Sequence, residues 1–231
     1  MRTGPPPDGE SDDASATSAD VRSRLVHCAV REFGAKGLEG ASTRCIAAAA
    51  GTFLSAITYY FGGKQGLYLA AAVHIAAVMA DRMEPAIAAE QTVPPEDPAA
   101  ARAAASRLMT RFLDEIARDD STDWSIFLLR EQLNPGSAFE RIWEGTMRSF
   151  MMRTAELVRS ATGTSVRDAA ITTMTLVGQA QAVRGLRAAL LRLSGLKALD
   201  EATVAMFRAR IAANVDAILC AQHGPPAAPP R

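Results

Sequence analysis

Cysteine is scarce in this chain, net charge is absent, and no long apolar run occurs. The 231 residues include 3 cysteines, Cys28, Cys45 and Cys220, and the formal net charge is zero. The wide separation of the cysteines argues against a zinc site and against a disulfide-stapled small domain. No apolar segment reaches the roughly 18–20 residues of a membrane span. We therefore expect no metal, no cofactor and no membrane association, and we expect a reducing, cytoplasmic environment.

Local signatures of catalysis are also missing. The sequence contains no G-x-S-x-G motif, no phosphate-binding loop and no dinucleotide-binding fingerprint. His74 has no second potential ligand at helical spacing, so we interpret it as a packed residue. The sequence therefore predicts no enzyme. An all-helical enzyme is therefore the weakest hypothesis for the function of this chain. It would need a polar cleft with a carboxylate or histidine whose pKa is strongly shifted.

The neutral total conceals an uneven distribution of charge. Residues 1–20 carry one basic and five acidic side chains, whereas residues 21–70 carry six basic and two acidic ones. The second segment therefore has a net charge of about +4. This is the sign expected of a surface that faces phosphate groups, although chance clustering would give the same pattern.

Apolar residues recur at helical spacing through most of the chain, and no segment has the alternation of a convincing strand. The sequence thus predicts an all-α fold with a small N-terminal three-helix domain over 20–66 and a larger helical domain over 67–222. Residues 1–19 and 223–231 are predicted to be disordered tails because they hold little to bury. About nine helices are expected, over 21–36, 42–51, 54–60, 64–93, 98–118, 123–133, 137–161, 166–193 and 199–221.

The most informative stretch joins two short helices through a tight turn. Ser42 is a suitable N-cap for a helix that ends at Gly51, and a helix of about two turns follows over 54–60. Small residues at 47–50 would let the two helices approach closely. Such a pair is typical of a helix-turn-helix, in which the first helix supports the second and the second lies in the major groove of DNA.

Helical spacing assigns two faces to this pair. Ile46, Ile57 and Phe61 are expected to face the core formed with the preceding helix, which Gly37 would end in a left-handed conformation. Hydroxyl groups on the opposite face could meet base edges or phosphates, and a large apolar side chain could touch a thymine methyl group. The face left exposed would carry Leu54, Ser55, Thr58 and Tyr59.

The residue types in this region form a recognisable pattern, namely Thr43-Arg44-x-Ile46-Ala47, Gly51 and Ile57-Thr58-Tyr59-Tyr60-Phe61-x-x-Lys64, with Phe33 and Gly37 before them. On these residues the sequence resembles the TetR family of bacterial regulators. The phrases ITYYFGGKQGLY and REQLNP, the latter at 130–135, look like the CecR-like branch of that family. The resemblance implies DNA binding by Ser42, Thr43, Arg44, Leu54, Ser55, Ala56, Thr58, Tyr59, Tyr60 and Lys64.

The same resemblance implies individual roles. Thr43 would hold a phosphate at a helix N-terminus, Arg44 would reach a base or a phosphate, and Tyr60 and Lys64 would contact phosphates. Plainer readings stay open, because both tyrosines could be core aromatics and both cations could be solvated surface residues. The sequence departs from the family in having Phe53 where a polar cap is usual and Thr58 where tyrosine is most frequent.

The second half of the chain is expected to hold a ligand pocket and a dimer surface, as the resemblance implies. Pockets combine an apolar lining with a few polar anchors, although the same residues could simply form core. The candidate ligand-binding residues are Trp124, Phe127, Leu128, Glu131, Trp143, Met147, Phe150, Met151, Met174 and Gln179. The candidate dimer surface is formed by the apolar stripes Leu176, Val183, Leu186, Leu190, Leu193 and Val204, Phe207, Ile211, Val215, Ile218.

The leading hypothesis is therefore a homodimeric repressor that binds a palindromic operator in double-stranded DNA and is released from it by a small-molecule inducer. The second hypothesis is a helix-turn-helix regulator without a small-molecule inducer, controlled by a protein partner. A sealed, well-packed interior over 98–193 would favour the second hypothesis over the first.

Overall fold

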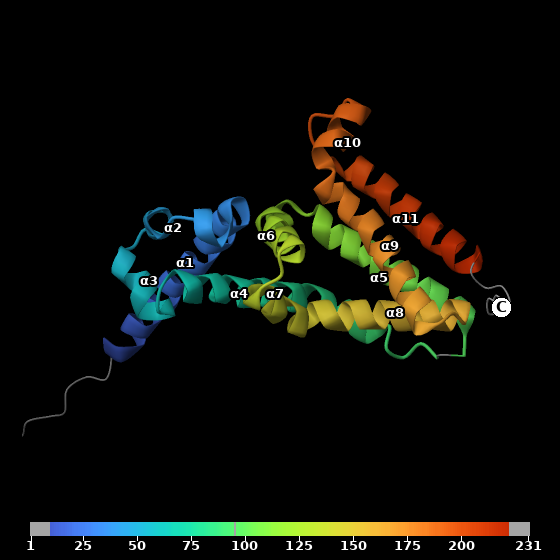
Figure 1. Cartoon of the computed structure of the whole chain (residues 1–231), viewed down its shortest axis with the longest axis horizontal. Helices are drawn as coiled ribbons and strands as arrows, with labels where there is room; N and C mark the ends of the chain where they lie inside the picture. Colours follow the sequence, from blue (N-terminus) through green and yellow to red (C-terminus); the bar gives the residue numbers. More distant parts are fainter. Residues whose placement is uncertain (1–9, 95, 222–231) are drawn as a thin grey trace, which may run out of the picture. The chain divides into compact units, whose positions relative to one another are not determined.

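The computed structural model describes residues 10–94 and 96–221, and within these residues it contains helices and no strands (Figure 1). The predicted all-α fold is therefore confirmed. The described residues form two compact units. Unit 1 comprises residues 10–75 and 126–141, and unit 2 comprises residues 76–94, 96–125 and 142–221.

Unit 1 combines the consecutive N-terminal helices with a segment from the middle of the chain. Its helices are α1 (Glu10–Gly40), α2 (Thr43–Ala49), α3 (Leu54–Phe61) and the first part of α4 (Lys64–Ala89), together with the end of α6 (Thr122–Leu133) and most of α7 (Ser137–Ile142). Its interior is lined by fully buried apolar side chains, including Leu25, Phe33, Ile46, Ile57 and Leu67. Three aromatic rings meet in it, since Tyr68 lies 4.8 Å from Phe33 and 4.9 Å from Phe127 between ring centroids.

The first helix differs from its prediction at its start. It begins at Glu10, so the described part of the predicted tail over 1–19 is helical, while residues 1–9 lie outside the described part. Residues 10–19 contain no proline or glycine, so nothing in the backbone interrupts the helix there. At the other end the chain bends at Gly37, whose φ of 73° and ψ of 175° are non-helical, as expected of a glycine at this position.

The predicted domain boundary at residues 66 and 67 also differs from the observed division. Leu67, Tyr68 and Ala71 are buried within unit 1, which therefore extends through Ile75. Gly66, in the first turn of α4, allows the backbone there to approach the end of α3 closely. A Cβ atom at residue 66 would lie 1.7 Å from the carbonyl oxygen of Phe61. The predicted C-terminal tail, 223–231, lies outside the described residues.

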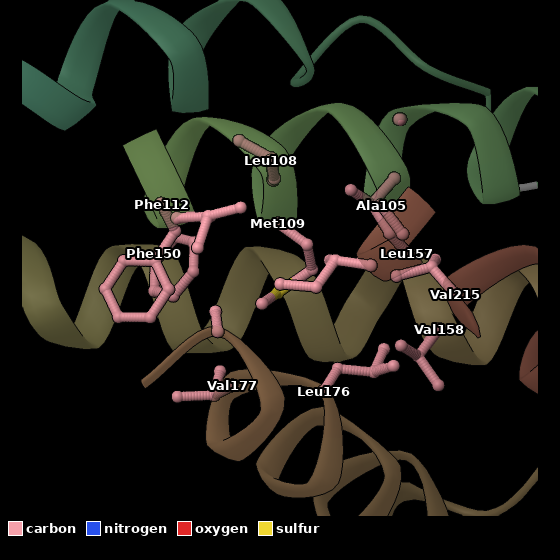
Figure 2. Close-up of a cluster of buried hydrophobic side chains, with 14 of the residues drawn as sticks. Ala105, Leu108, Met109, Phe112, Phe150, Leu157, Val158, Leu176, Val177 and Val215 are labelled. Carbon is pink, nitrogen blue, oxygen red and sulfur yellow. The ribbon is translucent and has the colours of Figure 1, made fainter. Parts of the chain in front are cut away.

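Unit 2 is built around long helices with one apolar core. Its main helices are α5 (Pro98–Ala117), α8 (Arg148–Thr162), α9 (Val166–Gly185) and α11 (Glu201–Ala221), and α5 packs against the other three. Figure 2 shows Leu108, Met109 and Phe112 of α5 pointing toward side chains of α8 and α9. The rings of Phe112 and Phe150 lie 4.7 Å apart between centroids.

Two of the long predicted helices of unit 2 are interrupted. The segment predicted as 137–161 is divided by a π-helical turn over Trp143–Met147, within which Gly145 has a ψ of −147°. A Cβ atom at Gly145 would lie 3.1 Å from the Cβ of Ala76, so glycine permits a close approach there. The segment predicted as 166–193 is divided after Gly185 into α9 and α10 (Arg187–Ser194). Glycine is among the weakest helix formers, which accounts for a break at this position.

Within the described residues, α4 is the one helix long and apolar enough to cross a membrane by length and composition alone. Core helices of soluble proteins meet the same criterion. Leu67, Ala71, Ile75, Met79 and Met83 of α4 are buried against other parts of the protein, which is the behaviour of such a core helix.

Candidate nucleic-acid interface

The start of α2 is fixed by side-chain hydrogen bonds. Ser42 is its N-cap, and its Oγ accepts a hydrogen bond from the backbone N–H of Cys45 at 3.3 Å. The backbone N–H of Ser42 donates to Oε1 of Glu32 on α1 at 3.1 Å, and the Lys36 ammonium donates to the same oxygen at 2.8 Å. These two donors, Lys36 first, lower the pKa of the Glu32 carboxyl group. The carboxylate therefore holds α2 against α1.

The two faces of α3 are separated as helical spacing predicts. Ile57 is 2 % exposed and contributes to the core of unit 1, whereas Tyr59 is 82 % exposed. Leu54, Ser55 and Thr58 are also exposed, so the outer side of α3 carries three hydroxyl groups, those of Ser55, Thr58 and Tyr59, together with the apolar side chain of Leu54. Ile46 is buried and Phe61 is half-buried, which agrees with their predicted orientation.

Phe53 occupies the N-cap position of α3. Its φ of −84° and ψ of 151° are extended, and no side chain caps the helix at this residue. The phenyl ring is 83 % exposed, the highest value among the large apolar side chains of unit 1. The departure of Phe53 from the usual polar cap thus leaves an uncapped helix start and an uncovered aromatic ring.

Two of the predicted phosphate-contacting residues, Tyr60 and Lys64, already have partners inside unit 1. The Tyr60 hydroxyl is hydrogen-bonded to the Ser18 hydroxyl at 2.9 Å, and the Lys64 ammonium donates to the carbonyl oxygen of Glu39 at 2.9 Å. Arg44 is exposed on α2, and Thr43 is half-buried at its first turn. An ammonium group has three N–H donors, so Lys64 retains two for a further acceptor.

Two arginines of α1 support the helix pair from behind. The Arg24 Nε donates to the carbonyl oxygen of Ala50, the residue that ends α2, at 3.1 Å. The Arg22 guanidinium lies 5.9 Å from the centroid of the Phe61 ring, within the range of a cation–π contact. These contacts join the ends of α2 and α3 to α1. The angle between α2 and α3 is therefore fixed partly by their contacts with α1.

The segment 126–141 attaches to the same unit through two charged side chains, Arg130 and Glu131. The sequence predicted Glu131 to bind a ligand and indicated no role for Arg130. Arg130 donates from Nε to the carbonyl oxygen of Gly34 at 3.2 Å and from Nη2 to that of Ala35 at 3.0 Å. These are carbonyls of the last turn of α1 before its bend, where helix carbonyls lack internal partners. A Cβ atom at Gly37 would lie 3.4 Å from this arginine side chain, so glycine leaves room for it.

Glu131, the neighbouring residue, is buried and receives two hydrogen bonds. The Tyr68 hydroxyl donates to its Oε1, and the backbone N–H of Phe139 donates to its Oε2 at 2.9 Å. Burial first, and then the contact with this carboxylate, raise the pKa of Tyr68. Sequence reasoning missed this role of Arg130 and Glu131, and the only signal was the REQLNP phrase that contains both.

The predicted ligand-binding residues are distributed over both units. Phe127, Leu128 and Glu131 are buried in unit 1. In unit 2, Trp124, Met147 and Phe150 are buried, Trp143, Met151 and Gln179 are half-buried, and Met174 is 51 % exposed. The assignment of a ligand to these residues stays a prediction.

Unit 2 also carries an open groove of about 360 Å³. It is lined by none of the predicted ligand-binding residues, and its wall consists of Ile87, Gln91, Ser149, Met152, Arg153 and Glu156. Across residues 10–94 and 96–221, no group of three or more histidine, cysteine or acidic side chains is placed to hold a metal ion.

A short helix that is buried on one side, open to solvent on the other and preceded by a tight turn and a supporting helix is the arrangement of helix-turn-helix DNA-binding regulators. The fold and the interface place the protein in this class. Residues 25–71 match the family model described as bacterial regulatory proteins, tetR family. Residues 101–222 match that of the C-terminal domain of the HTH-type transcriptional dual regulator CecR. The chain belongs to the TetR family and is a CecR-like member of it.

Individual relatives agree with this assignment. The chain is 32 % identical to the HTH-type transcriptional dual regulator CecR of Shigella flexneri over 204 residues, which cover 86 % of this chain and 91 % of the relative. A transcriptional regulator from Pseudomonas aeruginosa PAO1 has a similar fold, with a TM-score of 0.61, 18 % identity and coverage of 91 % and 93 % of the two chains. A TetR-like regulator from Rhodococcus sp. RHA1 has a TM-score of 0.60 at 20 % identity, with coverage of 85 % and 96 %.

Proposed function

We propose that this transcriptional regulator is a homodimeric, cytoplasmic repressor whose two α3 helices bind the half-sites of a palindromic operator, and that a small molecule releases it. One observation carries the DNA-binding part of the proposal. The outer side of α3 presents Ser55, Thr58 and Tyr59 to solvent, while Ile57 anchors the helix to the core. A side that is uncovered by the protein itself is available to enter a major groove.

The residues around α3 support contact with the DNA backbone. Arg44 is exposed at the start of α2, and the remaining N–H groups of Lys64 could donate to a phosphate. Tyr60 could bind a phosphate through its hydroxyl, which in the free protein is paired with Ser18. Each phosphate contact made by these groups would be independent of base sequence, so it would position α3 rather than specify the operator.

Uncovered apolar side chains on α9, α10 and α11 support dimerisation. Four of the ten residues predicted to form the dimer surface are internal to unit 2, because Leu176, Val183, Ile211 and Val215 are buried there. Other large apolar side chains of the same helices are exposed, namely Ile171, Met174, Leu186, Leu193 and Met206. A second copy of the chain covering these residues would remove them from water and supply the second recognition helix.

The test begins with selection of DNA from a random library by the full-length protein, followed by sequencing of the bound fraction. We expect an inverted repeat whose half-sites are spaced by about one helical turn. Arg44→Ala should then weaken binding to the selected site by about 10- to 100-fold in gel-shift titrations, as the loss of a base or phosphate contact predicts. Arg159→Ala removes an exposed arginine of α8 in unit 2 and serves as the matched control, with unchanged affinity expected.

The remaining parts of the proposal have separate readouts. Light scattering coupled to size-exclusion chromatography measures the oligomeric state, and a monomer would contradict the dimer. Screening small molecules for release of the selected DNA tests the inducer. If a protein partner releases the DNA and no small molecule does, the regulator is controlled by a protein. If the library yields no enriched sequence, the proposed function is wrong.

A further inference from the structure

The composition of α3 restricts how it could read bases. Its eight residues, LSAITYYF, include no arginine, lysine, asparagine, glutamine or acid. These are the side chains that recognise guanine, adenine or cytosine through strong or bidentate hydrogen bonds in the major groove. The exposed residues of α3 offer hydroxyl groups, which bond to several bases, and apolar surface. The apolar contact that discriminates between bases in the major groove is contact with the C5-methyl group of thymine.

Apolar surface is concentrated where α3 begins. Phe53 stands directly before the helix and is 83 % exposed, and Leu54 follows at 44 % exposed. The first residues of a recognition helix are those that contact base edges. Phe53 makes no capping hydrogen bond and is nearly uncovered, so neither helix stability nor core packing accounts for a phenylalanine at this position.

The net charge of the segment that carries this apolar surface favours DNA over a protein or a second copy of the chain as the occupant. Residues 21–70 carry six basic and two acidic side chains. The exposed Arg44 lies on the helix that supports α3, and Lys64 follows α3 directly. An aromatic ring on a segment of positive net charge can gain apolar contact at a base edge while basic side chains elsewhere on the segment meet phosphates.

We propose that Phe53 is a specificity-determining residue that reads the C5-methyl group of one thymine in each operator half-site. The inference rests on the proposed function and adds to it the kind of base that α3 selects. Leu54 extends the same apolar contact along the groove. The operator half-site must therefore contain at least one thymine whose methyl group, rather than its hydrogen-bonding edge, is required for full affinity.

The experiment removes single methyl groups from DNA. In the site selected by the full-length protein, each thymine of one half-site is replaced in turn by deoxyuridine, which lacks only the C5-methyl group. Burial of one methyl-sized group corresponds to about fourfold in a binding constant, so at one position the wild type should bind about fourfold more weakly. The variant Phe53→Ser should bind the thymine and deoxyuridine versions of that position equally.

Serine suits this substitution because it is a favoured N-cap and would preserve α3. Circular dichroism and thermal unfolding of Phe53→Ser should therefore match the wild type. Leu133→Ala, which removes a 72 % exposed leucine of α6 in unit 1, is the matched control and should retain the discrimination between thymine and deoxyuridine.

Several outcomes would overturn the inference while the proposed function stands. These are a selected site without thymine in its half-sites, equal binding of every deoxyuridine version by the wild type, and unchanged discrimination in Phe53→Ser. If no sequence is enriched in the selection, the proposed function fails and the inference fails with it.

Discussion

Units 1 and 2 differ in what holds their helices together. In unit 2 the long helices α5, α8, α9 and α11 share one large apolar core. In unit 1 the helices α2 and α3 are short, and the segment 126–141 is also attached through polar side chains, with Arg130 bound to carbonyls of α1 and Glu131 bound to Tyr68. Small units bury less apolar surface than large ones, so individual hydrogen bonds carry a larger share of their stability. The contrast predicts which substitutions each unit tolerates.

The largest effect is expected from a cavity in unit 2. Leu157 of α8 is 1 % exposed and lies in the shared core (Figure 2), so Leu157→Ala should lower the free energy of unfolding by about 2–5 kcal/mol. Urea unfolding followed by circular dichroism measures the change. Leu133→Ala, at a 72 % exposed position of α6, is the matched control and should change the free energy by less than about 0.5 kcal/mol. Equal costs for the two leucines would contradict the single apolar core of unit 2.

A smaller effect is expected from loss of one hydroxyl group in unit 1. Tyr68→Phe leaves the buried Oε1 of Glu131 without the hydrogen bond that it accepts, which should cost about 1–3 kcal/mol. Amide hydrogen exchange resolved by unit should show the loss of protection in unit 1. Tyr59→Phe removes the same atom from an 82 % exposed ring and should leave exchange unchanged. If Tyr68→Phe costs nothing, polar contacts do not hold the segment 126–141 in unit 1.

The smallest effects concern pH, and the stability of the two units should depend on pH in different ranges. Burial, and then the neighbouring His27 ring at 4.6 Å between centroids, lower the pKa of His74 in unit 1 from its ordinary 6.5. The unfolded chain therefore binds the proton more readily, so the stability of unit 1 should fall as pH drops below about 6.5. His74→Gln should remove this dependence, and exchange measured from pH 8 to pH 5 would detect it. No change over this range in the wild type would refute the prediction.

In unit 2 the corresponding group titrates at much lower pH. Hydrogen bonds from Arg118, and then from Arg82, lower the pKa of Asp120 from 3.8 to about 2. Its stabilising contribution is fully present above pH 3.8 and is lost as pH falls toward 2. Because the Asp120 side chain is 52 % exposed, solvent screening limits this contribution to below about 1 kcal/mol. Unit 1 should thus lose stability on acidification well before this contribution to unit 2 changes.

Local periodicity was sufficient for the parts of the fold that depend on neighbouring residues. It predicted α2 and α3, the burial of Ile57 and the exposure of Tyr59, and the bend at Gly37, because each follows from side chains within one or two helical turns. The DNA-contacting roles of the residues around α3 remain predictions, since exposure shows only that they are available. Periodicity failed at Gly145, where a single glycine within an apolar helical pattern gives no indication of a break.

Local sequence patterns could not show that the segment 126–141 belongs to unit 1. Local patterns assigned no role to Arg130 and predicted Glu131 to bind a ligand, because their partners on α1 and α4 lie about a hundred and about sixty positions away in the chain. Such pairings depend on how the helices fold back, and no local spacing encodes them. The compact units divide the chain at other residues than the predicted boundary for the same reason, since Tyr68 meets Phe127 only in the folded unit.

The contact between Arg130 and Gly34 has a consequence for synthesis of the protein. The two residues are 96 positions apart, so the last turn of α1 must wait for that many further residues before its carbonyl groups receive the guanidinium. At about 5–20 residues per second, a bacterial ribosome adds them in roughly 5–20 seconds. The N-terminal part of unit 1 is therefore synthesised first but receives its last contacts late. A nascent chain released before residue 130 would lack the contact of Arg130 with α1.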